Sequence, residues 1–391
     1  MVLELFDDQI RIPNSIAVLG ASARSAAFSV LRTGRPVVAA DLFADADLMR
    51  HCRATKISPY PEGLLDWLAE TNVDAWLYTG ALENYPELVD RLAAVRPLLG
   101  NSGEALRRCR DPARLQTLLS KNGLYFPETR ASCAGLPTDG SWLCKTYQGS
   151  SGSGVWEFVG KESRQQAEAC GAWFQKRVEG TLVSVVFVLG DAWTKVLGMT
   201  TQWVGSSRAG AAKFQYAGSL GIGPSISTTI RTQIDALAQI LADQFQLRGL
   251  VGVDLMLDSG RAWILEINPR YTASVEVVER NRGISAIEAH LAACTGNRLD
   301  FSRQEKPTGR PYGKAILYAK HEVTIKADFF AWAMAQAGSR LDSQLADIPD
   351  RGSTISSGSP VLSIFASATA TEIDRSLRRR IAEVETRLYL P

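Results

Sequence analysis

Two hydrophobic periods alternate over the first hundred residues of the chain. Short apolar runs predict buried strands at residues 16–19, 37–40 and 76–78. Longer stretches with apolar residues three or four positions apart predict a helix that follows Gly20–Arg24 and runs to about Thr33, and helices over 61–71 and 85–95. Strands that alternate with helices favour a doubly wound parallel sheet over residues 14–100.

The pattern changes after this region. One helix is predicted over residues 104–122, ending at Gly123, a common helix-terminating residue. Apolar and polar positions then alternate in a way that predicts strands over 142–147, 181–189, 192–204, 250–257 and 262–269. A long amphipathic helix is predicted over 226–246, so residues 105–300 read as an α+β unit.

A third region starts near Pro307. Strands and turns are predicted over 312–319, 346–349 and 358–368, with a closing helix over 371–386. We therefore expect a fold of α/β and α+β classes in three parts: an N-terminal α/β domain (1–103), a central domain (104–305) and a β-rich C-terminal lobe (306–391).

The composition of the chain argues against several classes of binding partner. The chain has 43 basic and 41 acidic residues, so its formal net charge of +2 gives no field for binding nucleic acid. The six cysteines are scattered without metal-ligand spacing, which favours free thiols in a reducing compartment. The N-terminus lacks the basic and apolar regions of a signal peptide, and the longest apolar run, near 182–189, is too short to span a bilayer. We expect a cytoplasmic protein without a membrane partner.

The strongest candidate chemistry lies in the hairpin at 250–270. Glu266 and Asn268 are two residues apart on one strand and therefore share a face. If the hairpin turns about Gly260 with an odd-length loop, Asp254 lies opposite Glu266. Two carboxylates and an amide oxygen are the hard ligands that Mg²⁺ prefers. Arg270 is placed to pair with phosphoryl oxygens or a substrate carboxylate, although a structural salt bridge explains it equally well.

A lysine followed by a flexible loop is the second candidate. Lys145 lies in an apolar strand directly before Gly149–Ser150–Ser151–Gly152–Ser153–Gly154, whose backbone N–H groups can wrap phosphates. The loop is not a Walker A motif, because no Gly-Lys-Ser/Thr follows it. The earlier turn after Gly20 lacks the further glycines of a dinucleotide fingerprint, which disfavours a NAD-dependent oxidoreductase.

The order of these pieces closely resembles the ATP-grasp superfamily over residues 14–300. The motifs are Lys145 with its Gly/Ser loop, then QKRVEG (175–180), GVDLML (252–257) and LEINPR (265–270). The tail resembles the C-terminal lobe of biotin carboxylase. The resemblance implies an ATP-grasp fold and a ligase that uses ATP and Mg²⁺.

Roles follow from the resemblance by position. It implies ATP contacts from Lys145, Gly149, Ser150, Ser151, Gly152, Ser153, Gly154, Gln175, Lys176, Arg177, Val178 and Glu179. It implies magnesium ligation by Asp254, Glu266 and Asn268, and phosphoryl contacts from Arg270 and Lys213. Two departures stand out. Pro112 occupies the position of a family lysine, with Arg108, Arg110 or Arg114 as replacements, and Leu182 replaces a ribose-binding acid, leaving Ser184 or Glu179.

The implied reaction is amide formation through an acyl phosphate, with release of ADP and phosphate. The combination of GASARSAA (20–27), TGALENYP (79–86), RDPARL (110–115) and NPRYTASVE (268–276) resembles ATP-grasp proteins of methanofuran-type or other C1-cofactor biosynthesis, including the tyramine–glutamate ligases. That likeness implies glutamate as acyl donor and tyramine or tyrosine as amine, with a substrate cleft lined by Arg24, Glu83, Asn84, Ser274 and Glu276. A biotin-carboxylase-like subunit and a non-catalytic nucleotide-binding protein stay open as alternatives, and so does a homodimer.

Overall fold

A computed structural model describes residues 12–301, 309–338 and 342–390. The prediction that the N-terminus is not a signal peptide was made from residues 1–13. Most of these lie outside the described residues. Among the helices in the described ranges, none combines the length and the apolar character needed to cross a bilayer.

The N-terminal region forms the predicted parallel sheet. Its strand order is β3-β2-β1-β4, from β1 (Ile16–Gly20), β2 (Val37–Asp41), β3 (Arg53–Lys56) and β4 (Ala75–Tyr78). Alternate residues of β1 enter two different cores, one beneath α1 (Arg24–Arg32) and one beneath α3 (Leu64–Glu70) and α4 (Pro86–Val95). The sheet is therefore covered on both faces, as doubly wound sheets are.

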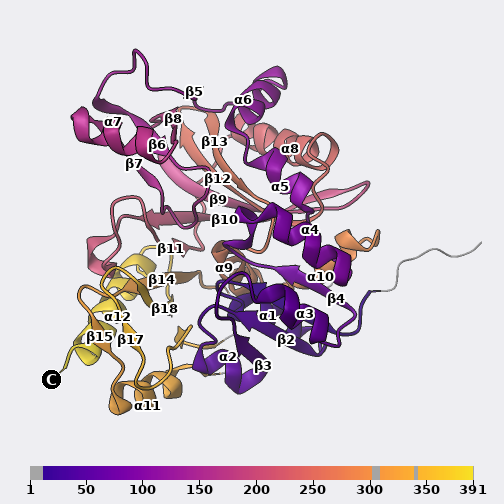
Figure 1. Cartoon of the computed structure of the whole chain (residues 1–391), viewed down its shortest axis with the longest axis vertical. Coiled ribbons are helices and arrows are strands. Elements are labelled where there is room, and N and C mark those ends of the chain that lie inside the picture. The colour runs from indigo at the N-terminus through magenta and orange to yellow at the C-terminus, as the bar shows by residue number, and fades with distance from the viewer. Residues whose placement is uncertain (1–11, 302–308, 339–341, 391) are drawn as a thin grey trace, which may run out of the picture.

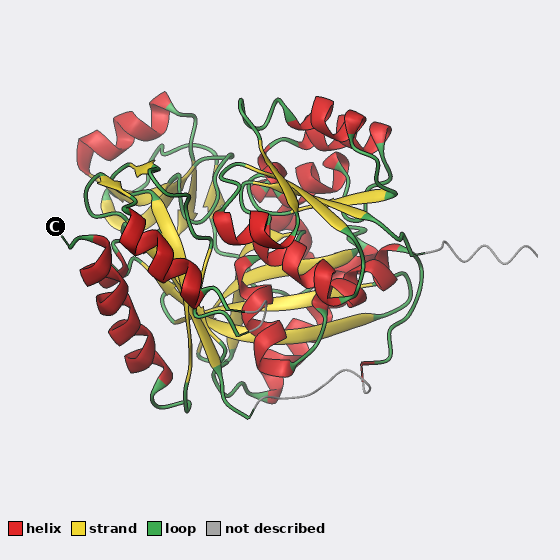
Figure 2. Ribbon diagram, turned by 90° about the horizontal axis from the view of Figure 1, so that it is seen from below, coloured by secondary structure: helices red, strands yellow, loops and turns green. Residues whose placement is uncertain are grey.

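A large antiparallel sheet runs through the centre of the molecule. Its order is β13-β12-β9-β10-β11-β14-β18-β16. The strands are β9 (Thr181–Leu189), β10 (Thr194–Val204), β11 (Tyr216–Leu220), β12 (Gly249–Asp258), β13 (Arg261–Asn268), β14 (Tyr312–Tyr318), β16 (Leu345–Ala346) and β18 (Pro360–Ser367). Three strands from beyond residue 305, β14, β16 and β18, thus extend the central sheet. Figure 2 shows the long strands with helices packed along them.

Helices cover this sheet on both sides. They are α8 (Thr228–Asp243), α9 (Ala273–Arg282), α10 (Ala286–Cys294) and α12 (Ile373–Leu388). The remaining elements of the C-terminal region are α11 (Ala327–Gln336), β15 (Val323–Thr324) and β17 (Thr354–Ile355). The N-terminal and C-terminal regions lie side by side in Figure 1, joined by a hydrogen bond from Ala46 N to Ile348 O next to α2 (Ala46–His51).

A small sheet stands opposite one end of the large one (Figure 1). It consists of β5 (Thr129–Arg130), β6 (Asp139–Lys145), β7 (Val155–Val159) and β8 (Trp173–Lys176), in the order β5-β8-β6-β7, with α7 (Gly160–Ala169) on one face. The Gly/Ser loop joins β6 to β7, so the small sheet carries both Lys145 and this loop.

The single helix predicted over 104–122 is wrong. The structure has two helices, α5 (Gly103–Cys109) and α6 (Pro112–Lys121). Asp111 is the N-cap of α6, and its Oδ1 accepts hydrogen bonds from the backbone N–H groups of Ala113 and Arg114, both at 3.0 Å. An N-cap aspartate followed by proline at the first helical position starts a new helix, so Asp111 and Pro112 divide the stretch.

A buried histidine joins the N-terminal region to the central sheet. His290 Nδ1 accepts a hydrogen bond from Leu250 N at 2.8 Å, and its Nε2 lies 3.1 Å from Leu99 O. The two partners require a neutral ring with its proton on Nε2. Burial lowers the pKa of His290 from 6.5 to about 4.

This histidine predicts acid-sensitive stability. Because the folded pKa lies below the unfolded one, the unfolded chain binds more protons, and stability present above pH 6.5 is lost as pH falls toward 4. His290 alone should lower the free energy of unfolding by about 2 kcal/mol between pH 7 and pH 5. Denaturant titrations of His290→Gln should show that much less pH dependence than wild type. His321→Gln, at an exposed site, is the control, and equal pH slopes in all three proteins would contradict the assignment.

Candidate active site

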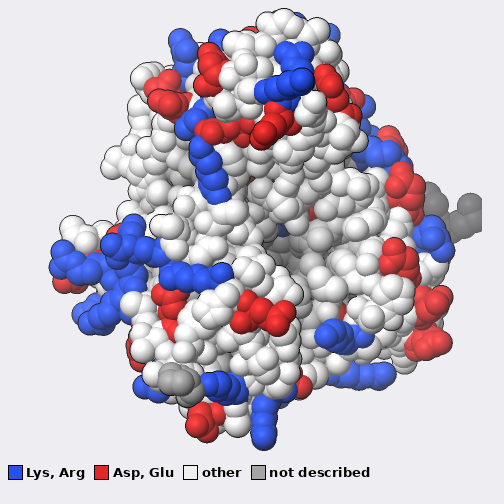
Figure 3. Space-filling view, turned by 60° about the vertical axis from the view of Figure 1, so that its left-hand side comes forward, with Lys and Arg blue, Asp and Glu red and all other residues white. Residues whose placement is uncertain are grey.

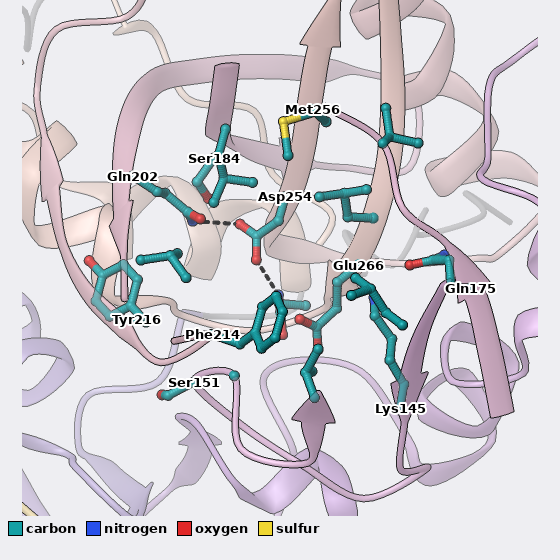
Figure 4. A pocket seen from close by; sticks show the side chains of 18 of the residues that line it. Lys145, Ser151, Gln175, Ser184, Gln202, Phe214, Tyr216, Asp254, Met256 and Glu266 are labelled. Atoms are coloured by element: carbon teal, nitrogen blue, oxygen red, sulfur yellow. Dashed lines mark hydrogen bonds between the residues drawn. The ribbon is translucent and has the colours of Figure 1, made fainter. Parts of the chain in front are cut away.

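A cavity of about 530 Å³ lies between the large and the small sheet. Its walls come from β9, β10, β12 and β13 on one side and from β6, β8 and the Gly/Ser loop on the other. Figure 4 shows Asp254 and Glu266 approaching this space from one side and Lys145 and Gln175 from the other. The groups predicted to bind metal and phosphate therefore share one cavity.

The predicted pairing of the two carboxylates is confirmed, but by a different route. Asp254 is the cross-strand partner of Glu266. The loop is not odd in length: Ser259 and Gly260 form a two-residue turn, both with positive φ, as hairpin turns of this length require. A bulge after Asp254 adds Leu265 to the partner strand and restores the pairing.

The amide of Asn268 completes the group. Its Nδ2 lies 3.5 Å from Asp254 Oδ2, and its Oδ1 accepts a hydrogen bond from Arg270 at 3.1 Å. Gln202 donates to Asp254 Oδ1 at 2.7 Å, as drawn in Figure 4. Asp254 is the more buried acid, whereas Glu266 is exposed to the cavity despite its apolar neighbours in the sequence.

The electrostatics of this group favour a cation. Burial and then the charge of Glu266 raise the pKa of Asp254 to about 6. A divalent cation would relieve this repulsion, and two carboxylates with one amide oxygen suit a metal that keeps other oxygen ligands. In the described part of the chain no three His, Cys, Asp or Glu side chains gather around a metal position, so water or phosphate would have to supply the rest.

Lys145, on the small sheet, lies close enough to both carboxylates for their charges to act on it. It ends β6, and its Nζ lies 5.3 Å from the ring centre of Trp173. Burial lowers its pKa, while the charges of Glu266 and Asp254 oppose that shift. The ammonium group of Lys145 therefore faces the carboxylates of Asp254 and Glu266. This arrangement is suited to binding a metal-bound polyphosphate between them.

The Gly/Ser loop is held in a defined turn. Ser151 O accepts a hydrogen bond from Tyr216 N at 3.0 Å, and Gly149 N donates to Asn84 Oδ1 at 3.2 Å. Gly152 has φ +81°, and a Cβ there would lie 1.8 Å from Phe214 O. These contacts hold the loop against Asn84 and the start of β11.

The close approach at Gly152 predicts a loss of catalysis on substitution. Gly152→Ala should force the loop away from Phe214 and lower kcat/KM for ATP by about 10- to 100-fold, because a displaced loop no longer encloses the phosphates. Gly171→Ala is a matched control: its φ is also positive, at +61°, but nothing lies within 4 Å of its Cβ position. Limited proteolysis with and without ATP measures the loop directly. Equal kinetics for the two variants would contradict a role for loop position.

The segment Gln175 to Glu179, predicted to bind adenine, lines the same cavity. Lys176 N and Arg177 N already donate to the carbonyls of Glu128 and Ser141, at 2.8 and 2.9 Å. Buried Gln175 Nε2 has no hydrogen-bond partner among the described residues. An unsatisfied buried amide in a cavity wall is available to a ligand acceptor.

The two predicted catalytic cations are both engaged in ion pairs. Arg270 Nε donates to Glu83 Oε1 at 2.7 Å. Glu83, which was predicted to line the substrate cleft, therefore positions Arg270, which was predicted to contact the phosphoryl group. Lys213 Nζ lies 2.6 Å from Glu157 Oε2, and its side chain is 64% exposed. Lys213 would have to leave Glu157 to reach a phosphate, whereas Arg270 is already fixed beside Asn268.

Arg110 is the best placed of the three candidates to replace the missing family lysine. It approaches Glu83 at 3.6 Å and donates to Tyr147 O at 3.1 Å, beside the Gly/Ser loop. Arg108 instead pairs with Glu104 at 2.7 Å. Arg110, the C-cap of α5, therefore links the end of that helix to the loop.

The residues predicted to line a substrate cleft separate into three places. Ser274 lies in the cavity wall, 3.3 Å from Ser219 Oγ. Glu83 and Asn84 line a neighbouring hollow beside Arg110. Arg24 and Glu276 lie instead in a buried cluster, where two hydrogen bonds of 2.9 and 2.8 Å join them.

This cluster explains why Arg24 and Glu276 are not in the cavity wall. Burial alone would raise the pKa of Glu276, but Arg24, Lys314 and Arg280 hold it well below its usual range. Arg24 also pairs with Asp347 at 2.6 Å. A buried charge without a partner is costly, so these residues satisfy one another across three parts of the chain and stabilise their contact.

Several cavity residues were not predicted from the sequence. These are Gln202, Tyr216, Met256 and Thr272. Ser184 was considered only for ribose, but it is the cross-strand partner of Asp254. Gln202 had a local signal, as a polar residue in an apolar strand, whereas the other positions depend on strand pairings that the sequence does not specify.

Comparison with known proteins agrees with this geometry. A family model described as an ATP-grasp domain matches residues 109–274. An uncharacterized protein of Methanocaldococcus jannaschii is 26% identical over 148 residues, which are 37% of this chain and about a third (33%) of that protein's length. The arginine-specific large chain of carbamoyl phosphate synthase from Bacillus subtilis is 31% identical over 77 residues, 20% of this chain and 8% of that one.

Solved structures resemble the chain over nearly its whole length. An N5-carboxyaminoimidazole ribonucleotide synthetase in complex with ADP has a TM-score of 0.72 at 15% identity, covering 98% of this chain and 100% of its own. An L-amino acid ligase from Bacillus licheniformis has a TM-score of 0.69 at 16% identity, covering 95% and 97%. Biotin carboxylase from Campylobacter jejuni has a TM-score of 0.65 at 13% identity, covering 91% and 87%.

At these identities the structural likeness establishes the fold alone. It confirms the predicted N-terminal parallel sheet and the biotin-carboxylase-like architecture. The chain therefore has an ATP-grasp fold, and its residues 109–274 match the ATP-grasp domain model.

Proposed function

We propose that this protein is an ATP- and magnesium-dependent carboxylate–amine ligase that forms an amide through an acyl phosphate. The observation that carries the proposal is the meeting of Asp254 and Glu266 with Lys145 across one cavity. Carboxylates for a metal, facing an ammonium group for phosphate, suit attack at the terminal phosphorus of ATP. The matched ATP-grasp domain contains all three residues.

The reaction needs no nucleophile from the protein. A substrate carboxylate oxygen attacks the γ-phosphorus, the bond to the β-phosphate oxygen breaks, and ADP leaves. The amine nitrogen then attacks the acyl carbon, the bond from that carbon to the phosphate oxygen breaks, and the amine loses a proton. Asp254, Glu266 and Asn268 would hold Mg²⁺, which neutralises phosphate charge when bound.

The described residues contribute positioning and exclusion of water. Gln175 to Glu179 would hold the adenine, with Ser184 or Glu179 near the ribose. Lys145 and the Gly/Ser loop would hold the phosphates, and Arg270, fixed by Glu83 and Asn268, would face the transferred group. A loop closed over the cavity protects an acyl phosphate from hydrolysis.

For the substrates we propose glutamate as acyl donor and tyramine or tyrosine as amine. Support comes from the motif resemblance to C1-cofactor ATP-grasp proteins and from the L-amino acid ligase among the similar folds. Ser274, in the cavity wall, and the hollow beside Glu83 and Asn84 are the sites where a carboxylate substrate would reach the terminal phosphate.

Product analysis tests the reaction class. With acid and amine both present, we expect ADP and phosphate, and with the amine omitted, hydroxylamine should intercept the acyl phosphate as a hydroxamate. AMP and pyrophosphate would refute the mechanism. ADP formed only with bicarbonate and biotin would identify a carboxylase. ATP binding without turnover across a broad panel of acids would indicate a nucleotide-binding protein. If another acid and amine react, only the glutamate and tyramine assignment is wrong.

A further inference from the structure

A second cavity, of about 820 Å³, adjoins the far side of the Gly/Ser loop. Its walls come from the N-terminal region, the loop residues Ser150, Ser151 and Ser153, and the C-terminal region. Ser151 also lines the nucleotide cavity, so the loop separates the two spaces. The face shown in Figure 3 is hollowed at its centre, with mostly uncharged side chains around the opening.

The wall formed by the N-terminal and C-terminal regions is rigidly held. Asp47 accepts hydrogen bonds from the backbone N–H groups of Asp347 and Ile348, at 3.1 and 2.9 Å. Ala44 and Asp347 have positive φ angles, +53° and +55°, which residues other than glycine rarely adopt. Such conformations persist where surrounding contacts impose them, and they are enriched at ligand sites.

One acid in this wall differs from its neighbours. Asp41 accepts three backbone hydrogen bonds, and Asp47 and Asp347 share Arg24. Asp45 lines the cavity and is only 6% exposed, yet no hydrogen bond or ion pair reaches its carboxylate from the residues that the structure describes. Burial and then the charges of Asp347 and Asp41 raise its pKa well above the usual range.

The space beside Asp45 is largely apolar. Phe43 and Met49 line it and are each 46% exposed, which is unusual for large apolar side chains. Ile316, Val361 and Leu362 contribute further apolar wall. Lys56 is the basic residue among the lining residues, and it is exposed. A ligand with a cationic head group and a hydrocarbon body would fit this cavity.

We propose that this cavity binds the amine substrate, with its ammonium group against the Asp45 carboxylate and its hydrocarbon body against Phe43 and Met49. The inference rests on the proposed ligase function, because it names the site of that reaction's second substrate. The Gly/Ser loop then lies between nucleotide and amine, where its movement controls when the two meet. Asp45 is a binding residue, and an isosteric amide in its place removes only the charge.

Calorimetry on the full chain tests this without turnover. The probes are phenethylamine and n-hexylamine, each compared with the alcohol of the same carbon skeleton. We expect each amine to bind at least about tenfold more tightly than its alcohol, because only the amine offers a charge-assisted hydrogen bond. Asp45→Asn should remove that preference and leave the affinity for ATP unchanged. Asp350→Asn, in the same cavity but exposed, is the control and should keep the preference.

Thermal melting separates binding from a structural role. Asp45→Asn should raise Tm, because it removes a buried charge that repels Asp347 and Asp41. A lower Tm, equal affinity for amine and alcohol, an unchanged preference in Asp45→Asn, or no amine binding at millimolar concentration would each overturn the proposal. If amines bind as expected but no acid supports ADP formation, the ligase function fails while the amine site stands.

Discussion

Replacing Glu266 by Gln or Asp254 by Asn is expected to lower kcat by at least about 10³-fold, which corresponds to roughly 4 kcal/mol of lost transition-state stabilisation. The two carboxylates are cross-strand partners facing one cavity, so each supplies half of the negative charge available to a metal there. Both amides keep the shape of the side chain. Asp254→Asn should also leave the fold intact or stabilise it, because it removes a buried repulsion.

The control for this prediction lies on the same hairpin. Asp258→Asn changes an acid at the end of β12 whose Oδ1 accepts a hydrogen bond from Ser259 Oγ at 2.8 Å, outside the cavity wall. Its kcat should match wild type. ADP formation should be measured over a series of magnesium concentrations with circular dichroism as the check on folding. Near-normal activity in both active-site variants, with magnesium still required, would remove the metal assignment.

The hairpin shows what local sequence patterns can and cannot specify. The period of two along a strand placed Glu266 and Asn268 on one face, and the Gly260 turn brought Asp254 near them. The bulge at Leu265 was not predictable, because a bulge depends on how both strands pack and not on either strand's pattern. The predicted pairing of Asp254 with Glu266 was correct. It depends on a two-residue turn and a bulge, however, and not on the odd-length loop from which it was predicted.

Misplaced residues were those whose role depends on distant partners. Arg24 and Glu276 were assigned to a substrate cleft only because the resemblance implied it. Their buried pairing joins positions 252 residues apart, and no local pattern indicates it. Glu157, which pairs with Lys213 from strand β7, was missed for the same reason. Sequence periodicity reports which residues are buried, not which buried charges meet.

The helix and strand boundaries were also predicted well only where the local sequence pattern determines them. Long periodic strands such as β9 were predicted to the residue, because burial on both faces leaves an unbroken apolar run. Short or polar elements such as β3 and β5 were missed, since edge strands carry little apolar signal. The continuation of the central sheet into β14 and β18 also has no local signature, because strand order is set by tertiary contacts.

Replacing Lys145 by Met is expected to raise KM for ATP and lower kcat, with kcat/KM falling by about 10²-fold, or roughly 3 kcal/mol. Lys145 offers an ammonium group whose pKa is lowered by burial, facing the carboxylates across the cavity. Its proposed partner is a phosphate of ATP, because it lies directly before the Gly/Ser loop. Methionine keeps most of the aliphatic stem and removes the ammonium group that lies over the Trp173 ring.

The discriminating measurement is ATP binding by calorimetry together with thermal melting. If Lys145 holds phosphates, Lys145→Met should bind ATP more weakly by about tenfold or more, while Tm stays equal or rises, because a partly desolvated charge has been removed. Lys195→Met, on β10 with its Nζ 5.6 Å from the ring centre of Phe301, is the control and should match wild type in both assays. Unchanged ATP affinity in Lys145→Met, or a lower Tm, would show that this lysine serves the fold and not the nucleotide.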